Sequence, residues 1–235
     1  MPRDQRAVRP TNAMIITIDG PAGTGKSSVA QVVADWLGFD FLDTGAMYRT
    51  IAFESLRRNA NLSDQRELAF VARHCRIDFD WSKKPPGVNL NDEPVGRHLR
   101  SGEVTRATSI VAAVAAIREQ MVGEQQRIGR EHGQLVTEGR DQGSVVFPQA
   151  PFKFYLDATP AERARRRAAQ LRHRGEIIDQ NEILRDIVER DKRDASRAVG
   201  PLAVPMGAIV IDTTHLTQEQ VVEKLVAIVR GGQRQ

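Results

Sequence analysis

The sequence predicts a doubly wound α/β fold built on a five-stranded parallel sheet, with a small insertion and a helical lid. Short apolar segments alternate along the chain with segments of helical periodicity, which favours parallel strands joined by helical crossovers. A glycine-rich turn joins the first apolar segment to the first helical one. Two stretches break the alternation, one with short β-like pieces and one with arginine-rich helices. We therefore expect one large core with two smaller appendages.

The expected core begins with Met14–Asp19, an almost continuous apolar run typical of a strand buried on both faces. After the glycine turn, Val29, Val33 and Trp36 recur at helical spacing, and Gly38 is suited to end that helix. The other expected core elements are a strand at 39–42, a helix at 46–58, and strands at 135–137, 152–156 and 208–211.

Two appendages are expected. Between residues 60 and 100, β-like pieces at 77–81, 88–90 and 94–95 alternate with turn residues and predict an antiparallel insertion. Thr159 and Pro160 predict the start of a helix that runs to Leu171, and a second helix is expected at 181–196. The expected organisation is a disordered basic tail at 1–13 and one domain at 14–235, with core segments 14–59, 101–158 and 198–230, an insertion at about 60–100 and a lid at about 159–197.

Composition excludes several classes. The chain has 235 residues and 26.1 kDa, with 40% hydrophobic and 27% charged residues, which is ordinary for a soluble globular protein. No apolar run reaches the roughly 20 residues that cross a bilayer, and the first residues lack a secretory apolar stretch, so we expect a cytoplasmic protein without a membrane partner. Cys75 stands alone, and the histidines show no metal-ligand spacing around it. We expect a monomer, because the sequence shows no exposed apolar stripe of the kind that forms a subunit interface.

A net charge of +4 and a pI near 9.6 suit a partner that carries phosphate, whether a small nucleotide or a nucleic acid. The glycine turn gives the sharper indication, because it matches G-x-x-x-x-G-K-[ST] between a buried strand and a helix, as Gly20-Pro21-Ala22-Gly23-Thr24-Gly25-Lys26-Ser27. Backbone N–H groups of such a loop surround phosphate oxygens, Lys26 reaches the β and γ phosphates, and Ser27 offers its hydroxyl to Mg²⁺. A turn that only resembles the pattern is the alternative, and a phosphate loop alone does not name a reaction.

Two further segments follow expected strands, at the sheet edge where open α/β folds collect ligands. Arg49 is placed to bind a second phosphate, although it could also be a solvated helix residue with Thr44 or Asp43 as a plain N-cap. Arg140 and Asp141 lie between glycines that leave the backbone open to a ligand, although this cluster could also be a surface turn.

The arginine-rich helices allow both a functional and a structural interpretation. Arg190, Asp194 and Arg197 fall at i, i+4 and i+7 and so share one helix face, but neighbouring acids also fit a solvated, salt-bridged helix. The arginines between Arg163 and Arg174 could form a solvent face or a nucleic-acid patch, although aromatics for base stacking are missing there.

Taken together, four motifs in one order resemble the bacterial cytidylate kinase family, from Met14 to about Val229. The motifs are I-D-G-P-A-G-T-G-K-S-S, L-D-T-G-A-M-Y-R, E-G-R-D-x-G-S-V-V-F-P from Glu138, and E-R-D-x-R-D-x-x-R-A-V-x-P-L from Glu189. The resemblance implies transfer of the γ-phosphoryl group of ATP, with Mg²⁺, to CMP or dCMP. It also implies that the insertion is a nucleotide-binding subdomain and that the arginine-rich helices form the lid.

The resemblance assigns roles to residues of this sequence. The cytosine would contact Ser109, Arg118 and Asp141, the sugar would contact Asp194, and the acceptor nucleotide and its phosphate would contact Thr44, Arg49, Arg140, Arg190 and Arg197. The expected catalytic residues are Lys26, Arg140 and Arg190. We expect ATP to contact residues 20–27 together with Ser28, Arg163 and Arg167. Gln142 departs from the family, which usually has an apolar residue there, and we expect only a packing adjustment.

Elementary chemistry agrees with the base assignment. A carboxylate such as Asp141 accepts from the amino group of cytosine, and a guanidinium such as Arg118 donates to the ring carbonyl, so the two disfavour uracil. Two rival functions stay open. One is an RNA- or DNA-binding phosphate-loop protein, which the interspersed acids and the 5% aromatic content disfavour. The other is a kinase of another acceptor, such as uridine or thymidine monophosphate or shikimate.

Overall fold

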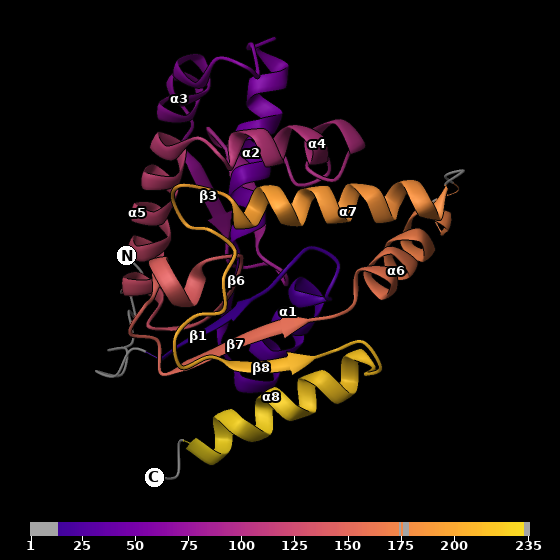
Figure 1. The fold of residues 1–235 in the computed structure, drawn as a ribbon. Coiled ribbons are helices and arrows are strands. Elements are labelled where there is room, and N and C mark those ends of the chain that lie inside the picture. The colour runs from indigo at the N-terminus through magenta and orange to yellow at the C-terminus, as the bar shows by residue number, and fades with distance from the viewer. Residues whose placement is uncertain (1–13, 174, 176–178, 233–235) are drawn as a thin grey trace, which may run out of the picture.

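The computed structural model describes residues 14–173, 175 and 179–232, and in these residues a five-stranded, entirely parallel sheet forms the centre of the molecule (Figure 1). Its strand order is β2-β6-β1-β7-β8, which confirms the doubly wound fold that the sequence predicts. The bounds are β1 Met14–Asp19, β2 Asp40–Asp43, β6 Gln134–Glu138, β7 Phe152–Asp157 and β8 Ile209–Asp212, each within two residues of the expected bounds.

Helices cover the sheet and extend beyond it. Helix α1 packs against α8 on one side of the sheet, whereas α2 packs against α4 in the upper half of the view in Figure 1. The helices are α1 Lys26–Leu37, α2 Thr44–Arg57, α3 Gln65–Arg73, α4 Gly102–Val111, α5 Ala115–His132, α6 Pro160–Arg172, α7 Gln180–Ala195 and α8 Gln218–Gly232. Of these, α3, α4, α5 and α8 were not predicted, and α2 begins two residues before the expected start.

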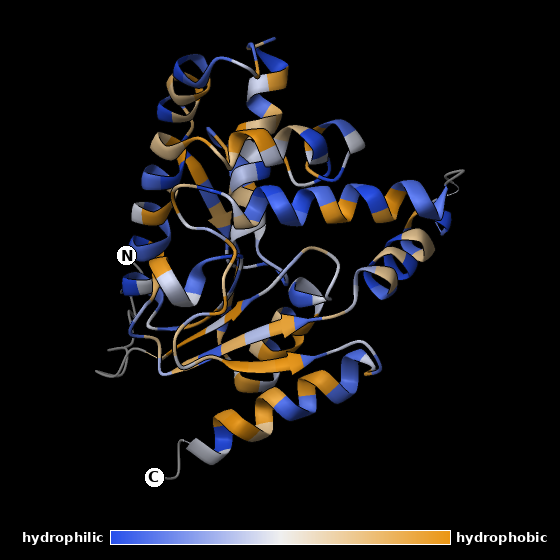
Figure 2. Cartoon of the chain, viewed as in Figure 1, coloured by the Kyte–Doolittle hydropathy of each residue, from blue (hydrophilic) through white to orange (hydrophobic). Residues whose placement is uncertain are grey.

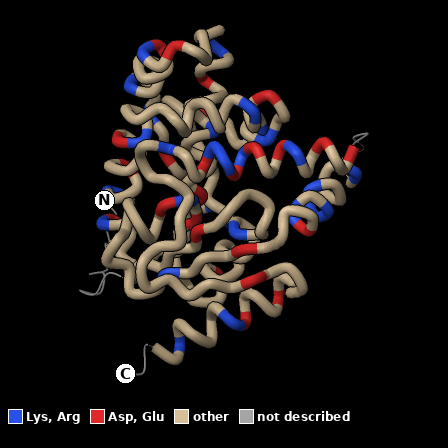
Figure 3. The backbone as a smooth tube through the Cα atoms, in the orientation of Figure 1, with Lys and Arg blue, Asp and Glu red and all other residues tan. Residues whose placement is uncertain are grey.

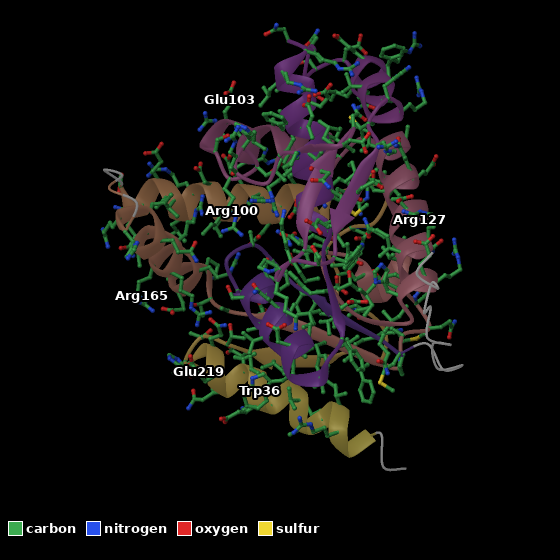
Figure 4. All side chains as sticks on the ribbon, turned by 180° about the vertical axis from the view of Figure 1, so that it is seen from behind. Trp36, Arg100, Glu103, Arg127, Arg165 and Glu219 are labelled. Carbon is green, nitrogen blue, oxygen red and sulfur yellow. The ribbon has the colours of Figure 1, made fainter. Side chains whose placement is uncertain are left out.

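Two apolar clusters stabilise this arrangement. One joins the sheet to α1 and α8 through residues such as Ile16, Phe154 and Leu225, and the other joins α2, α4 and α5 to the insertion. Figure 2 shows the corresponding apolar sheet and the two-sided colouring of α8. Trp36, which recurs at the expected helical spacing, is 53% exposed and lies at the surface beside α8 (Figure 4). The buried stripe of α1 is Val29, Ala30, Val33 and Ala34, whose small alanines pack inward and leave Trp36 outside.

The insertion is antiparallel, as predicted. It contains β3 Ile77–Asp80, β4 Gly87–Leu90 and β5 Glu93–Pro94, in the order β3-β4-β5. Trp81, just after β3, packs on the ring of His132 with 3.9 Å between ring centroids. Nδ1 of His132 lies 2.6 Å from Oδ2 of Asp40 in β2. His132 of α5 therefore contacts both Trp81 and Asp40, and it connects the hairpin to the core.

Helices α6 and α7 also begin close to the expected positions. The hydroxyl of Thr159 accepts from the N–H of Glu162, and Pro160 is the first residue of α6, as predicted. Helix α7 ends at Ala195, so Arg197 lies just past the helix. The expected tail at residues 1–13 lies outside the described residues. Within them, Cys75 is a free, buried thiol, and no helix has the length and apolarity that a membrane span requires.

We expect Phe154→Ala to lower the free energy of unfolding by about 3–5 kcal/mol, because Phe154 is fully buried in the inner strand β7 and its removal leaves a cavity. Urea unfolding followed by circular dichroism measures the change. The matched control is Phe70→Ala on α3, where the ring is 51% exposed and a loss of about 0.5 kcal/mol or less is expected. Equal losses in the two variants would contradict this description of the core.

Candidate active site

The glycine loop lies between β1 and α1, where its backbone turns back on itself. Gly20, Gly23 and Gly25 have φ angles of 142°, 85° and 91°, a region that side chains other than glycine rarely adopt. A Cβ at Gly20 would also overlap the carbonyl oxygen of Leu156 in β7. The loop therefore needs glycine at these positions, and β7 lies directly behind it.

Lys26, the first residue of α1, folds back over the loop. Its Nζ donates to the Pro21 carbonyl at 2.6 Å, and the side chain is almost entirely buried. Burial, with the positive charge of Arg140 in second place, lowers the pKa of Lys26 to about 7. An anion beside Nζ would favour the charged form again. A phosphate bound beside Lys26 would therefore stabilise the charged form of its side chain.

Ser27 faces a carboxylate from another strand. Its hydroxyl donates to Oε1 of Glu138 at 2.8 Å, and Glu138 is the last residue of β6. Burial raises the pKa of Glu138, and the nearby carboxylate of Asp43 acts in the same direction. Hydroxyl and carboxylate oxygens are ligands that Mg²⁺ prefers, so this pair fits a magnesium ion. The sequence analysis did not assign a role to Glu138, although an acid at the end of a buried strand was a usable signal.

The start of α2 supplies the next wall of the site. Asp43 caps the helix by accepting from the N–H of Ala46 at 2.9 Å, and it also accepts from Nη2 of Arg49 at 2.7 Å. Thr44 is buried, and its hydroxyl donates to the Glu138 carbonyl at 2.7 Å. The N-cap is therefore Asp43, and Thr44 joins α2 to the end of β6. Arg49 is mostly buried, so it is not a plain solvated residue.

Helix α7 brings the second group of charges, in a stretch of mixed sign visible in Figure 3. Asp194 is buried and accepts from Nε of Arg140 at 2.9 Å and from Nη2 of Arg197. Although burial alone would raise it, the charges of Arg140 and Arg197 hold the pKa of Asp194 below its ordinary value. Burial, followed by repulsion from Arg140, lowers the pKa of Arg190 to about 10, and Arg197 and Arg49 add to that repulsion. Arg49 of α2 and Arg140 of the segment after β6 therefore lie near Arg190 of α7.

Two of the three residues expected to contact cytosine meet in the fold, Arg118 from α5 and Asp141 from the segment after β6. Arg118 and Asp141 form a buried ion pair, and Nη1 of Arg118 also donates to the Ala112 carbonyl at 3.1 Å. Ser109 is buried on α4. The sequence analysis missed Tyr48, whose ring centre lies 5.5 Å from the guanidinium carbon of Arg118. The expected base-binding pair is thus already paired in the protein without ligand.

Unpaired guanidinium nitrogens indicate where a ligand fits. Among the described residues, four arginines have a buried Nε without a hydrogen-bond partner: Arg49, Arg118, Arg190 and Arg197. All four are residues that the sequence analysis placed around the acceptor. Because a buried donor without a partner costs free energy, an anionic ligand that accepts from these nitrogens gains what the free protein lacks.

Below the site, a buried polar network joins the phosphate loop to the arginine segment. Asp19, the residue before Gly20, accepts from the backbone N–H groups of Gln142 and Gly143 at 2.8 and 2.7 Å. The side chain of Gln142 accepts from Thr137 and donates to Gln125, each at 2.9 Å. Gln142 is therefore a hydrogen-bonded member of this network. The expectation of a packing adjustment alone left out these hydrogen bonds. Its amide satisfies polar neighbours that an apolar residue leaves unpaired.

The other expected ATP contacts differ in their surroundings. Ser28 is exposed at the start of α1. Arg163 is almost completely buried, and the protein itself occupies two of its nitrogens, whereas Arg167 is half-buried on the same helix. Arg165 extends into solvent, as Figure 4 shows, and pairs with Glu162.

The glycine loop, the strand order and the arginines facing the loop define a kinase of the P-loop class. In fold, the chain resembles a solved structure of an uncharacterized protein from Eubacterium ventriosum, with a TM-score of 0.50 and 13% identity over 94% of this chain and 99% of that one.

Sequence comparison places the chain more narrowly. Residues 16–231 match the cytidylate kinase family. A cytidylate kinase from Caldanaerobacter subterraneus subsp. tengcongensis is 43% identical over 92% of this chain and 94% of its own length. A cytidylate kinase from Pelotomaculum thermopropionicum is also 43% identical, over 94% of this chain and 97% of its own length. The chain therefore belongs to the cytidylate kinase family.

The Asp19 network predicts a particular pH dependence of stability. Burial raises the pKa of Asp19 to about 6 from an ordinary 3.8, so between these values the folded protein holds a proton that the unfolded chain has lost. The free energy of unfolding should therefore fall as pH rises through this window, by about 3 kcal/mol at 1.4 kcal/mol per pH unit.

Urea unfolding of the unaltered protein and of Asp19→Asn at pH 4 to 7 checks this. The variant keeps the size of the side chain but cannot titrate. The unfolding free energy of the unaltered protein minus that of the variant should therefore fall as pH rises. Parallel stability profiles would mean that the Asp19 carboxyl titrates normally in the folded protein.

Proposed function

We propose that the protein transfers the γ-phosphoryl group of ATP to CMP or dCMP, with ADP and CDP or dCDP as products. One observation carries this proposal. Arginines of three separate helices, Arg49 in α2, Arg118 in α5 and Arg190 in α7, have buried Nε groups that lack partners, and Arg190 lies near Lys26 of the glycine loop. A loop suited to one phosphate chain thus faces a cluster suited to a second phosphate. Membership in the cytidylate kinase family supports the choice of acceptor.

On the donor side, the backbone N–H groups of residues 20–27 would surround the phosphates of ATP, and Lys26 would lie beside the β and γ phosphates. Ser27 and Glu138, 2.8 Å apart, are the residues that would hold Mg²⁺. When bound, the ion would supply positive charge that stabilises the phosphates of ATP. Lys26 adds a buried cation whose proton becomes more firmly held as the anion arrives.

On the acceptor side, Asp194 would contact the sugar. The acceptor nucleotide and its phosphate would contact Thr44, Arg49, Arg140, Arg190 and Arg197. Asp141 would accept from the amino group of cytosine, while Arg118 would donate to its carbonyl and Ser109 would add a hydrogen bond. Uracil presents a carbonyl in place of the amino group, so a buried carboxylate at this position disfavours it.

Transfer would proceed in line between the two bound nucleotides. The phosphate of CMP is already an adequate nucleophile, so this site requires positioning and charge stabilisation more than a general base. Lys26, Arg140 and Arg190 would stabilise negative charge as it moves toward the leaving ADP. Closure of the lid would exclude water, which would otherwise hydrolyse ATP.

Lys26→Ala should lower kcat for CMP phosphorylation on the order of a thousandfold or more, because it removes the cation nearest the transferred group. A coupled assay of ADP release measures the loss, and circular dichroism checks the fold. Lys224→Ala on the exposed side of α8 is the control and should retain normal turnover. Near-normal turnover of Lys26→Ala would contradict the proposed donor site.

Ser109→Ala should raise KM for CMP about three- to tenfold and leave KM for ATP unchanged, because one hydrogen bond to the base is lost. Steady-state kinetics with both substrates varied gives the two constants. Thr105→Ala lies one turn earlier on α4, where its hydroxyl donates to the Ser101 carbonyl, and should change neither constant.

A panel that includes UMP, dTMP, shikimate and single-stranded RNA tests the rival functions, and preference for any of them over CMP would overturn the base assignments.

A further inference from the structure

Arg163 connects two halves of the candidate site from behind. It lies in the first turn of α6 and is almost completely buried. Its Nε donates to the Ala158 carbonyl at 2.9 Å, and its Nη1 donates to the carbonyl of Ala22 in the glycine loop at 3.2 Å. The same Nη1 lies 2.6 Å from Oδ2 of Asp191 on α7. One guanidinium thus contacts the end of the β7 segment, the glycine loop and the lid helix.

The contact with the glycine loop is close. A Cβ on Gly23 would lie 3.1 Å from the Cβ of Arg163, so α6 and the loop pack without room for a side chain. A loop that turns its N–H groups toward phosphate leaves carbonyl oxygens directed elsewhere, and these need donors of their own. Arg163 supplies a donor to the Ala22 carbonyl. On the same helix, Arg166 lies 3.5 Å from the Thr24 carbonyl and binds the Thr213 carbonyl.

The contact with α7 involves the part of that helix that carries the acceptor residues. Asp191 directly follows Arg190, and Asp194 lies one turn later, where it binds Arg140 and Arg197. The side chains of Arg163 and Asp191 are 4% and 22% exposed, so their ion pair is shielded from solvent to a degree that surface pairs are not. Helices α6 and α7 also pack against one another.

We propose that Arg163 is a positioning residue rather than an ATP contact. Through its pair with Asp191 it holds the glycine loop and α7 at a fixed separation, so that Lys26 and Arg190 lie on opposite sides of the transferred phosphoryl group. Two of its nitrogens are already bound to the protein, and an ATP contact through them would require these bonds to break. This inference rests on the proposed function, and it replaces the ATP-binding role that the sequence analysis gave to Arg163.

The test uses the full chain and the variants Arg163→Lys, Asp191→Asn and the double variant. A lysine keeps the charge but cannot bond to two groups in the geometry of a guanidinium, and asparagine removes the charge at constant size. Each single variant should lower kcat about tenfold and leave KM for ATP within twofold. Ground-state binding of ATP stays intact, whereas the glycine loop and α7 are no longer held in the same relative position. The double variant should be no slower than the slower single variant, because both changes remove one shared interaction.

Two controls come from the same helices. Arg165→Lys on α6 and Asp186→Asn on α7 change exposed residues of the same types and should leave kcat unchanged. Thermal unfolding of every variant shows whether it is folded at the assay temperature. Calorimetric titration with ATP gives the affinity of each folded variant without turnover.

Several results would overturn the inference. If Arg163→Lys weakens ATP binding tenfold while Asp191→Asn has no effect, Arg163 contacts the nucleotide. If both variants turn over normally, or if their effects on kcat multiply, the pair does not act as a unit. The proposed function is judged separately on the unaltered protein, and it is overturned if that protein does not transfer phosphate to CMP. If the unaltered protein does so and Asp191→Asn is equally active, only the role of the Arg163–Asp191 pair is overturned.

Discussion

The structure depends above all on cationic groups that are held close together away from water. Burial, followed by repulsion from Arg140, lowers the pKa of Lys26 to about 7 and that of Arg190 to about 10, whereas the nearby carboxylates of Asp194 and Glu138 raise the pKa of Arg140 against its burial. Asp194 and Glu138 offset part of this repulsion. The remainder requires an anion, and the free protein therefore keeps an electrostatic preference for a phosphate-bearing ligand.

The sheet order brings these charges to one place. Strand β1 lies between β6 and β7, and β6 lies between β1 and β2, so the segments that follow β1, β2 and β6 leave the sheet at the same edge. The glycine loop, the start of α2 and the Arg140 segment are those three segments. Hydrogen bonds from Ser27 and Thr44 to Glu138, and from Gln142 and Gly143 to Asp19, then fix them relative to one another.

Much of this could be predicted from the sequence, because the core strands are uninterrupted apolar runs and the glycine loop has a fixed spacing. Helices α4 and α5 escaped prediction, since their buried faces include Ser109, Arg118 and Gln125, polar residues that weaken a periodic apolar pattern. The pairing of Arg118 with Asp141 depends on two segments that meet only in the fold, so local spacing carries no sign of it. The domain limits and the roles of the site residues stay predictions.

The parallel pairing of β1 has a consequence for the order in which the chain acquires structure. Strand β1 pairs with β6 and β7, which belong to the second half of the sequence, whereas the β3-β4-β5 hairpin pairs entirely within itself. During synthesis the hairpin is complete while β1 still lacks both neighbours. The glycine loop, which needs the β7 carbonyl of Leu156 behind Gly20, therefore takes shape late, and a growing chain gains its affinity for nucleotide only after most of it has left the ribosome.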